Sequence, residues 1–90
     1  MKFEWDPNKA ASNLRKHGVA FDEASTVFMD ALALSGTNPE NSDGEARFVT
    51  FGLSALGRML AVFHAYRSGA IRRFSARPMT RMERRIYEEG

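Results

Sequence analysis

Arginine dominates the charge of the last quarter of the chain. Residues 67–90 carry seven Arg, no Lys and three Glu, whereas residues 1–66 carry six Lys and Arg against eight Asp and Glu. The planar guanidinium has a fork of N–H donors that grips a phosphate or a carboxylate at two points. This segment therefore predicts a site for a polyanion or for an acidic partner. The alternative is a solvated basic helix.

Histidine and tyrosine side chains near these arginines indicate which reaction such a site would support. Metal-free RNA cleavage begins when a ribose 2′-hydroxyl attacks the adjacent phosphate. It needs a base, an acid for the leaving oxygen, and positive charge on the developing phosphorane. His, Glu, Lys or Tyr can move the protons, Arg can supply the charge, and Phe or Tyr can stack unpaired bases. The same side chains would also suit a binding surface without catalysis.

Other classes of site find no support in the sequence. The chain has no Cys, which excludes disulfides, zinc fingers and thiol catalysis. The two histidines, His17 and His64, have no carboxylate partner at metal-ligand spacing, and there is no Gly-rich phosphate loop, serine elbow or cofactor fingerprint. We therefore expect no metal and no cofactor.

The 90 residues predict one domain, residues 1–90, outside the membrane. No apolar run approaches the roughly 20 residues of a membrane helix. The first nine residues, MKFEWDPNK, place an acid and a Trp where a secretion signal would be apolar. We expect a cytoplasmic protein.

Helix signals are clear in the first half of the chain. Asp6 followed by Pro7 is a typical N-cap and first helical position, and Gly18 after basic residues is a typical helix end. Asp22 is expected to cap a second helix. The expected elements are a strand over residues 2–5, helices over 8–17 and 22–29, a strand over 30–35 and a loop over 36–46.

The second half predicts three strands and a helix. Ser68-Gly69 is a hairpin turn signal, and the short connections favour an antiparallel meander over residues 47–53, 58–66 and 70–77. Thr80 and Glu83 form a capping box, after which Met82 and Ile86 share one side of the helix with Met79 before it. The predicted fold is α+β, in the order β-α-α-β-β-β-β-α, with the helices on one face of a twisted antiparallel sheet.

Strand alternation divides the chemical residues between two sheet faces. Arg47 shares a side with Val49 and Phe51, and His64 shares one with Leu60, Val62 and Tyr66; Ile71, Arg73, Ser75 and Arg77 share one side of the last strand, and Arg72 lies on the other. We expect the face away from the helices to collect Arg47, His64 and some of Arg72, Arg73 and Arg77. A one-residue slip in register would exchange the faces. The alternatives are a cross-strand ion pair for Arg47 and a half-buried, hydrogen-bonded role for His64.

Lys16 and His17 end the first helix in the stretch LRKHG. Positive charge is favoured at the negative end of a helix dipole, which suits His17 to phosphate binding or proton donation. The alternative is a helix stop signal without chemistry.

Several motifs in sequence order resemble the BrnT family of type II toxins. They are Phe3-Glu4-Trp5-Asp6-Pro7-Asn8-Lys9, Asn13, Lys16-His17-Gly18-Val19, Phe21, Glu23-Ala24, Val27-Phe28-Met29-Asp30, Gly44-Glu45-Ala46-Arg47, Gly52, Ile71-Arg72, Ser75-Ala76-Arg77, Glu83-Arg84 and Tyr87-Glu88. The resemblance covers nearly the whole chain. The chain departs from it at Pro78-Met79, where many relatives have a more basic stretch.

The resemblance implies a small ribonuclease toxin with a RelE-like fold that inhibits translation. It also implies a BrnA-like ribbon-helix-helix antitoxin as partner, a 2:2 heterotetramer and repression of the promoter through the antitoxin's DNA-binding part. Together with the residue patterns, it predicts two groups of site residues. The candidate catalytic residues are Arg47, Arg77, His17, His64 and Tyr87, and the candidate RNA phosphate contacts are Lys16, Arg72, Arg73, Arg81 and Arg84.

Overall fold

The chain folds in the predicted order of strands and helices. The computed structural model describes residues 2–37 and 47–90, without the side chains of Arg73 and Phe74. The predicted loop over 36–46 falls mostly outside the described residues, and Gly36 belongs to a strand. The elements are β1 (Lys2–Glu4), α1 (Pro7–His17), α2 (Phe21–Thr26), the short 3₁₀ helix η1 (Val27–Met29), β2 (Leu34–Thr37), β3 (Arg47–Leu53), β4 (Met59–Arg67), β5 (Ala70–Pro78) and α3 (Arg81–Glu89).

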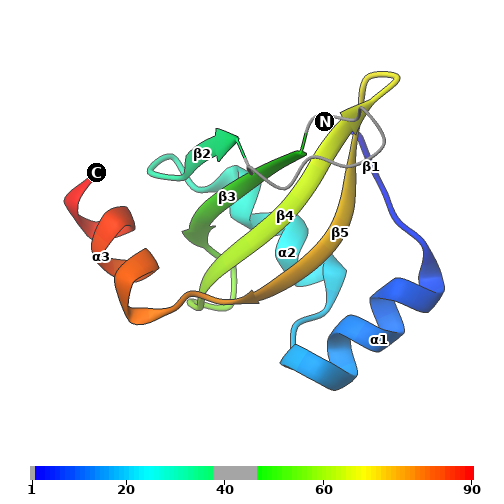
Figure 1. The fold of residues 1–90 in the computed structure, drawn as a ribbon, viewed down its shortest axis with the longest axis horizontal. Coiled ribbons are helices and arrows are strands. Elements are labelled where there is room, and N and C mark those ends of the chain that lie inside the picture. Colours follow the sequence, from blue (N-terminus) through cyan, green and yellow to red (C-terminus); the bar gives the residue numbers. More distant parts are fainter. Residues whose placement is uncertain (1, 38–46) are drawn as a thin grey trace.

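The strands form a single five-stranded sheet in the order β1-β5-β4-β3-β2. The β3-β4-β5 meander is antiparallel, as predicted, and β2 pairs antiparallel to β3. The edge strand β1 instead runs parallel to β5, so the sheet is mixed, which the alternation of residues 2–5 did not predict. In Figure 1, α2 lies behind the strands, α1 lies beside β5, and α3 stands beyond the other end of the sheet.

Helix α1 follows its sequence signals closely. The Asp6 carboxylate accepts the Asn8 N–H at 2.8 Å, and Pro7 is the first helical residue. Gly18 ends the helix in the left-handed region at φ 68°, where glycine avoids the steric cost of a Cβ.

Two predictions for the following segment are wrong. The N-cap of α2 is Ala20 without a side-chain hydrogen bond, because Phe21 is buried in the first turn and Asp22 lies beside it, at the positive end of the dipole. The strand expected over residues 30–35 starts only at Leu34. Asp30 first turns the chain by accepting the N–H groups of Leu32 and Leu53.

One face of the sheet carries the hydrophobic core. Val19, Phe21, Ala24 and Val27 from the α2 segment pack on Leu60, Val62 and Ala76 of the sheet. Gly52 of β3 allows η1 to approach closely, since a Cβ there would lie 2.6 Å from Val27 Cγ1. The core therefore fixes which sheet face is left for other roles.

A β-bulge in β5 changes the alternation that the sequence predicts. Arg73 pairs with His64 and Ser75 with Phe63, so β5 has one extra residue at this point. Ile71 and Ser75 consequently lie on opposite faces, and the prediction that they share a side is wrong. The extra residue brings Arg72 to the same face as Arg77.

Helix α3 is attached by polar contacts more than by burial. The capping box forms as predicted, with the Thr80 side chain accepting the Glu83 N–H and the Glu83 carboxylate accepting the Thr80 N–H. Met79 is buried, but Met82 and Ile86 are 72% and 48% exposed, and no residue of α3 is buried. Two members of the predicted apolar side of α3, Met82 and Ile86, therefore remain largely exposed.

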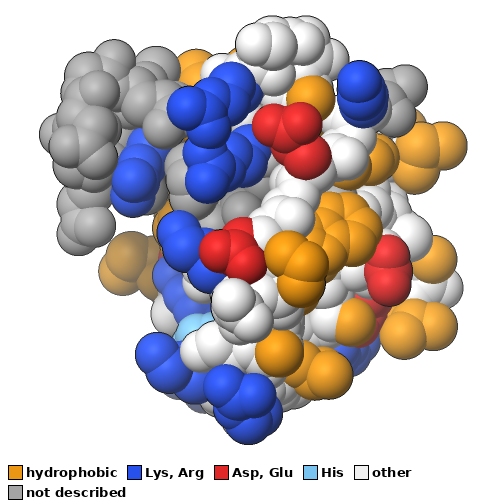
Figure 2. Space-filling view, turned by 90° about the vertical axis from the view of Figure 1, so that its right-hand side faces the viewer, with side chains coloured by type: hydrophobic (Ala, Val, Ile, Leu, Met, Phe, Trp, Pro, Cys, Tyr) orange, Lys and Arg blue, Asp and Glu red, His pale blue; other side chains and the backbone are white. Residues whose placement is uncertain are grey.

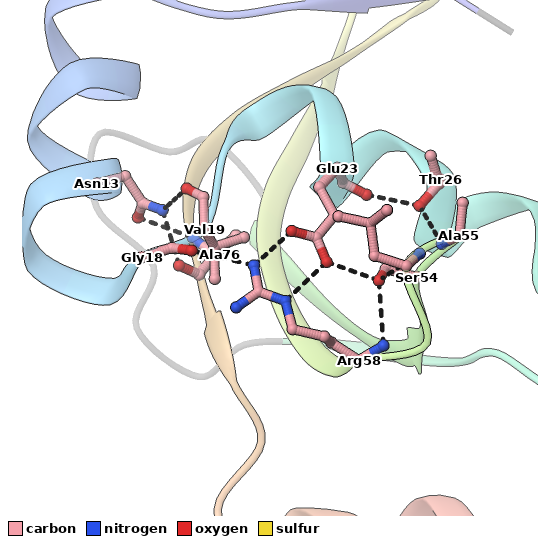
Figure 3. A network of polar contacts seen from close by, with 10 residues as sticks. Asn13, Gly18, Val19, Glu23, Thr26, Ser54, Ala55, Arg58 and Ala76 are labelled. Atoms are coloured by element: carbon pink, nitrogen blue, oxygen red, sulfur yellow. Dashed lines mark hydrogen bonds and ion pairs between the residues drawn. The ribbon is translucent and has the colours of Figure 1, made fainter.

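A polar network ties α1, α2 and the β3–β4 turn together (Figure 3). The buried Glu23 carboxylate is paired with the Arg58 guanidinium and accepts the Ser54 hydroxyl at 2.7 Å. Arg58 also donates to the Gly18 carbonyl at 3.0 Å, at the end of α1. The hydrogen bond from Arg58 holds the pKa of the Glu23 carboxyl below its ordinary value.

We expect Glu23→Gln to lower the free energy of unfolding at pH 7 by about 2 kcal/mol, the typical contribution of hydrogen bonds to a buried charged group. A carboxyl whose pKa is lowered in the folded state stabilises the protein at pH values above its unfolded-state pKa. This stabilisation is lost as the pH falls through the folded-state pKa. The difference between wild type and Glu23→Gln should therefore narrow below about pH 4.5. Urea denaturation at pH 7 and pH 3 measures this difference in the free energy of unfolding, and Glu89→Gln, at an exposed position, is the control. An unchanged difference would contradict the role of the ion pair.

Candidate nucleic-acid interface

The sheet face opposite the core presents three rows of side chains, here called the open face. Pairing along β3, β4 and β5 places Arg47, Ala65 and Arg72 in the first row, Val49, Phe63 and Ser75 in the second, and Phe51, Ala61 and Arg77 in the third. Neighbouring strands lie about 4.8 Å apart, so Arg47 and Arg72 start roughly 10 Å apart. Four residues of β4 separate the first and third rows, or roughly 13 Å.

Arg77 is held on the open face by an aromatic ring and a carboxylate. Its guanidinium carbon lies 5.2 Å from the centroid of the Phe63 ring, a cation–π contact. Its two terminal nitrogens donate to both carboxylate oxygens of Glu83, at 2.6 and 2.8 Å. This fork-to-fork pairing lowers the pKa of Glu83 and raises that of Arg77. Arg77 is thus oriented over the aromatic centre of the face.

Arg47 and Arg72 are half-buried at the other end of the open face. Arg72 lines a hollow with Trp5 and the carboxyl-bearing Glu4 and Asp6 at the β1–α1 junction. Half-buried Phe63 lies between these two arginines and Arg77 along β4. The face therefore combines positive charge at both ends with an aromatic ring available for stacking.

Asn13 attaches α1 to the free edge of β5. Its amide nitrogen donates to the carbonyls of Val19 and Ala76 at 2.9 and 2.8 Å, and its oxygen accepts the Ala76 N–H at 3.0 Å (Figure 3). The side chain thus replaces a neighbouring strand at Ala76. Sequence reasoning missed this role, although Asn13 stands among the motifs that resemble the family.

The basic end of α1 borders the open face at Ser75. Lys9, Lys16 and His17 line a hollow of about 220 Å³ with Ser12, Asn13 and Ser75. Figure 2 shows this side of the molecule, where Lys and Arg side chains gather along one half and hydrophobic side chains along the other. The predicted residues Lys16 and His17 are therefore exposed at the rim of the arginine face.

His64 lies on the core face and not with Arg47, contrary to the prediction. It is fully buried, its Nε2 is hydrogen-bonded to Thr50 Oγ1 at 2.8 Å, and its ring contacts Phe28 edge-on at 5.0 Å. The reason is strand alternation, since His64 shares the side of Val62, which the helices cover. A buried His64 cannot contact a substrate on the open face.

Tyr87 also lies away from the open face. Its hydroxyl donates to the Asp30 carboxylate, which ties the last turn of α3 to the end of η1. This hydrogen bond raises the pKa of Tyr87 to about 12, which disfavours a role in proton transfer near neutral pH. Arg81 and Arg84 are exposed on α3, and the side chain of Arg73 lies outside the described residues.

The described ranges 2–37 and 47–90 contain no cluster of three or more His, Asp or Glu side chains that could hold a metal ion. No helix within these ranges is long and apolar enough to cross a membrane.

Glu83 has a second role that sequence reasoning missed. The sequence predicted it as part of the capping box of α3, and the structure shows that its carboxylate is also the partner of Arg77.

Comparisons with known proteins identify the fold and the family of the chain. A search of curated proteins finds no match. The crystal structure of the Brucella abortus ribonuclease toxin BrnT superimposes with a TM-score of 0.64 over 90% of this chain and 99% of that chain, and 24% sequence identity shows a shared fold. The family model described as "Ribonuclease toxin, BrnT, of type II toxin-antitoxin system" matches residues 5–83. The chain therefore belongs to the BrnT family of ribonuclease toxins of type II toxin–antitoxin systems.

Proposed function

We propose that this toxin is a metal-independent endoribonuclease that binds single-stranded RNA on the open face and inhibits translation by cutting it. The supporting observation is that Arg47, Arg72 and Arg77 share one sheet face around Phe63. Arginines hold and neutralise phosphates, and an aromatic ring stacks an unpaired base without regard to its sequence.

In the proposed reaction, the ribose 2′-oxygen bonds to phosphorus as its proton passes to a base, and the bond from phosphorus to the 5′-oxygen breaks. The products are a 2′,3′-cyclic phosphate and a 5′-hydroxyl. Arg77 and its neighbouring arginines stabilise the charge of the phosphorane. His17, at the rim beside Ser75, donates the proton to the leaving 5′-oxygen.

The proposed partner is a BrnA-like ribbon-helix-helix antitoxin that inhibits the toxin by covering the open face with acidic side chains. We further propose a complex of two toxins and two antitoxins that represses its own promoter through the antitoxin, in the cytoplasm. The support is membership of a type II toxin–antitoxin family. Charge complementarity to the arginines is the physical basis.

The test is expression in a bacterial host, with and without the protein encoded beside the toxin. Growth should stop with the toxin alone and resume with both. The purified toxin should cut a single-stranded oligoribonucleotide in EDTA, or mRNA on ribosomes in magnesium buffer. Intact RNA in both assays and normal growth would overturn the proposal.

A second candidate is a non-catalytic co-repressor, favoured by the absence of His64 and Tyr87 from the open face. It predicts RNA binding without cleavage. That binding should weaken with salt, with a log–log slope of roughly 0.7 per phosphate contact. Cleavage in either assay above decides against it.

We expect His17→Ala to reduce the cleavage rate by about 100-fold, the lower end of the contribution of a general acid. Arg15→Ala is the matched control, because Arg15 is also exposed in the last turn of α1 but does not line the hollow. Single-turnover cleavage of an oligoribonucleotide measures the rates of both variants and of wild type. If His17→Ala cleaves as fast as Arg15→Ala, LRKHG is only a helix end.

A further inference from the structure

Glu83 occupies the edge of the Arg77 guanidinium that is formed by its two terminal nitrogens, one of the two edges at which a guanidinium binds a phosphate in a bidentate manner. Both terminal nitrogens of Arg77 point at the Glu83 carboxylate, and Arg77 is half-buried beneath the first turn of α3. Carboxylate and phosphate are bound by the same planar fork in the same bidentate manner. The two anions therefore exclude one another at these donors.

We infer that Glu83 is a built-in competitor of the RNA phosphate for Arg77, and that α3 releases Arg77 when RNA binds. This inference rests on the proposed function, in which Arg77 contacts the substrate. It makes α3 a self-inhibitory cover, so that affinity for RNA is lower than the arginines of the open face alone would give.

The attachment of α3 suits such a release. The helix buries no residue, and among residues 2–37 and 47–90 two hydrogen-bonded side-chain pairs attach it to other elements: Glu83 with Arg77 in its first turn and Tyr87 with Asp30 in its last. The helix also lies against β3. Release of the Glu83 carboxylate would leave the other half of the capping box, in which Thr80 Oγ1 accepts the Glu83 N–H. Helix α3 can thus release Arg77 without uncovering a buried residue of its own and without losing its N-cap.

Glu83→Gln tests the competition directly. Glutamine also serves in a capping box, so the variant keeps the helix start while losing the charge that holds Arg77. Glu88→Gln is the matched control, since it makes the same charge change at an exposed position of the same helix. The probe is a fluorescent single-stranded oligoribonucleotide with 2′-O-methyl groups, which cannot be cleaved, and its binding is followed by anisotropy.

We expect Glu83→Gln to bind the probe about two- to fivefold more tightly than Glu88→Gln, the factor that corresponds to a partly exposed ion pair. In an Arg77→Ala background the same substitution should give no such gain. Equal affinities of Glu83→Gln and Glu88→Gln, with circular dichroism showing both folded, would overturn the inference.

The Arg77→Ala single variant separates the two possible failures. If it binds the probe as tightly as wild type, Arg77 is not an RNA contact and the proposed site fails. If it binds more weakly while Glu83→Gln gains nothing over Glu88→Gln, the site stands and the competition fails.

Discussion

Arg77→Ala reduces the rate of RNA cleavage by about 100- to 1,000-fold in the expected result, and the protein stays folded. This is the usual effect of removing one donor that stabilises charge in a transition state. The stability cost is small, about 1 kcal/mol, because the lost ion pair with Glu83 is partly exposed. Single-turnover cleavage of an oligoribonucleotide and thermal melting measure the two effects separately.

Two further variants make this result specific. Arg85→Ala removes an arginine of α3 that is exposed and lies off the open face, so its rate should match wild type. Arg77→Lys keeps the charge but loses the fork, and we expect an intermediate rate. A fully active Arg77→Ala would remove Arg77 from the site.

We expect Asn13→Asp to lower the free energy of unfolding by about 3 kcal/mol at pH 7, although the substitution only replaces one NH₂ group by an oxygen. The Asn13 nitrogen donates to two carbonyls, of Val19 and Ala76, and a carboxylate oxygen there would meet both without a proton. Protonation restores a donor to one of them. The folded-state pKa of Asp at position 13 is therefore expected to lie above its unfolded value of about 3.9.

The sign of the pH dependence follows from that shift. A raised carboxyl pKa destabilises the fold above the folded-state value, and this penalty disappears as pH falls below the unfolded value. The deficit of Asn13→Asp relative to wild type should thus shrink between pH 7 and pH 4, whereas that of Asn13→Ala should stay constant. Urea titrations of all three proteins check it; parallel deficits for both variants would contradict the proposed contacts.

Local signals account for most of the elements that the sequence predicted. Asp6-Pro7, Gly18 and the Thr80–Glu83 capping box act within a few residues, and each forms as expected. The Ser68-Gly69 turn also forms, with positive φ at both residues. The family resemblance was carried by such local motifs, and the family model confirms it.

Non-local choices could not be predicted in the same way. The parallel pairing of β1 with β5 joins residues nearly seventy positions apart, between Lys2 and Ala70. Strand alternation predicted which residues of β5 share a sheet face only up to the bulge. The amphipathic pattern of α3 did not reveal that Met82 would remain exposed. These features depend on which surfaces meet, and no single segment encodes that.

The candidate site shows the same division. Arg47 was expected to share a face with some of Arg72, Arg73 and Arg77, and the strand register places Arg47, Arg72 and Arg77 on the open face. His64 was expected with them, although alternation already placed it on the side of Leu60 and Val62, which the helices cover. It is fully buried and hydrogen-bonded to Thr50, which is closer to the alternative role. Asn13 and the second role of Glu83 depend on contacts with β5, so the residues around them in sequence gave no warning.

Because of the bulge in β5, both ends of that strand bury an apolar side chain on one face and present an arginine on the other. Ile71-Arg72 and Ala76-Arg77 are five residues apart, an odd spacing that would point one arginine into the core of a regular strand. With the extra residue, each apolar member is buried and each arginine faces outward. A one-residue deletion at position 74 would therefore remove the bulge and leave the two pairs four residues apart. Because an even spacing keeps side chains on one face of a regular strand, both arginines would still face outward, and the strand would lose only its local bend.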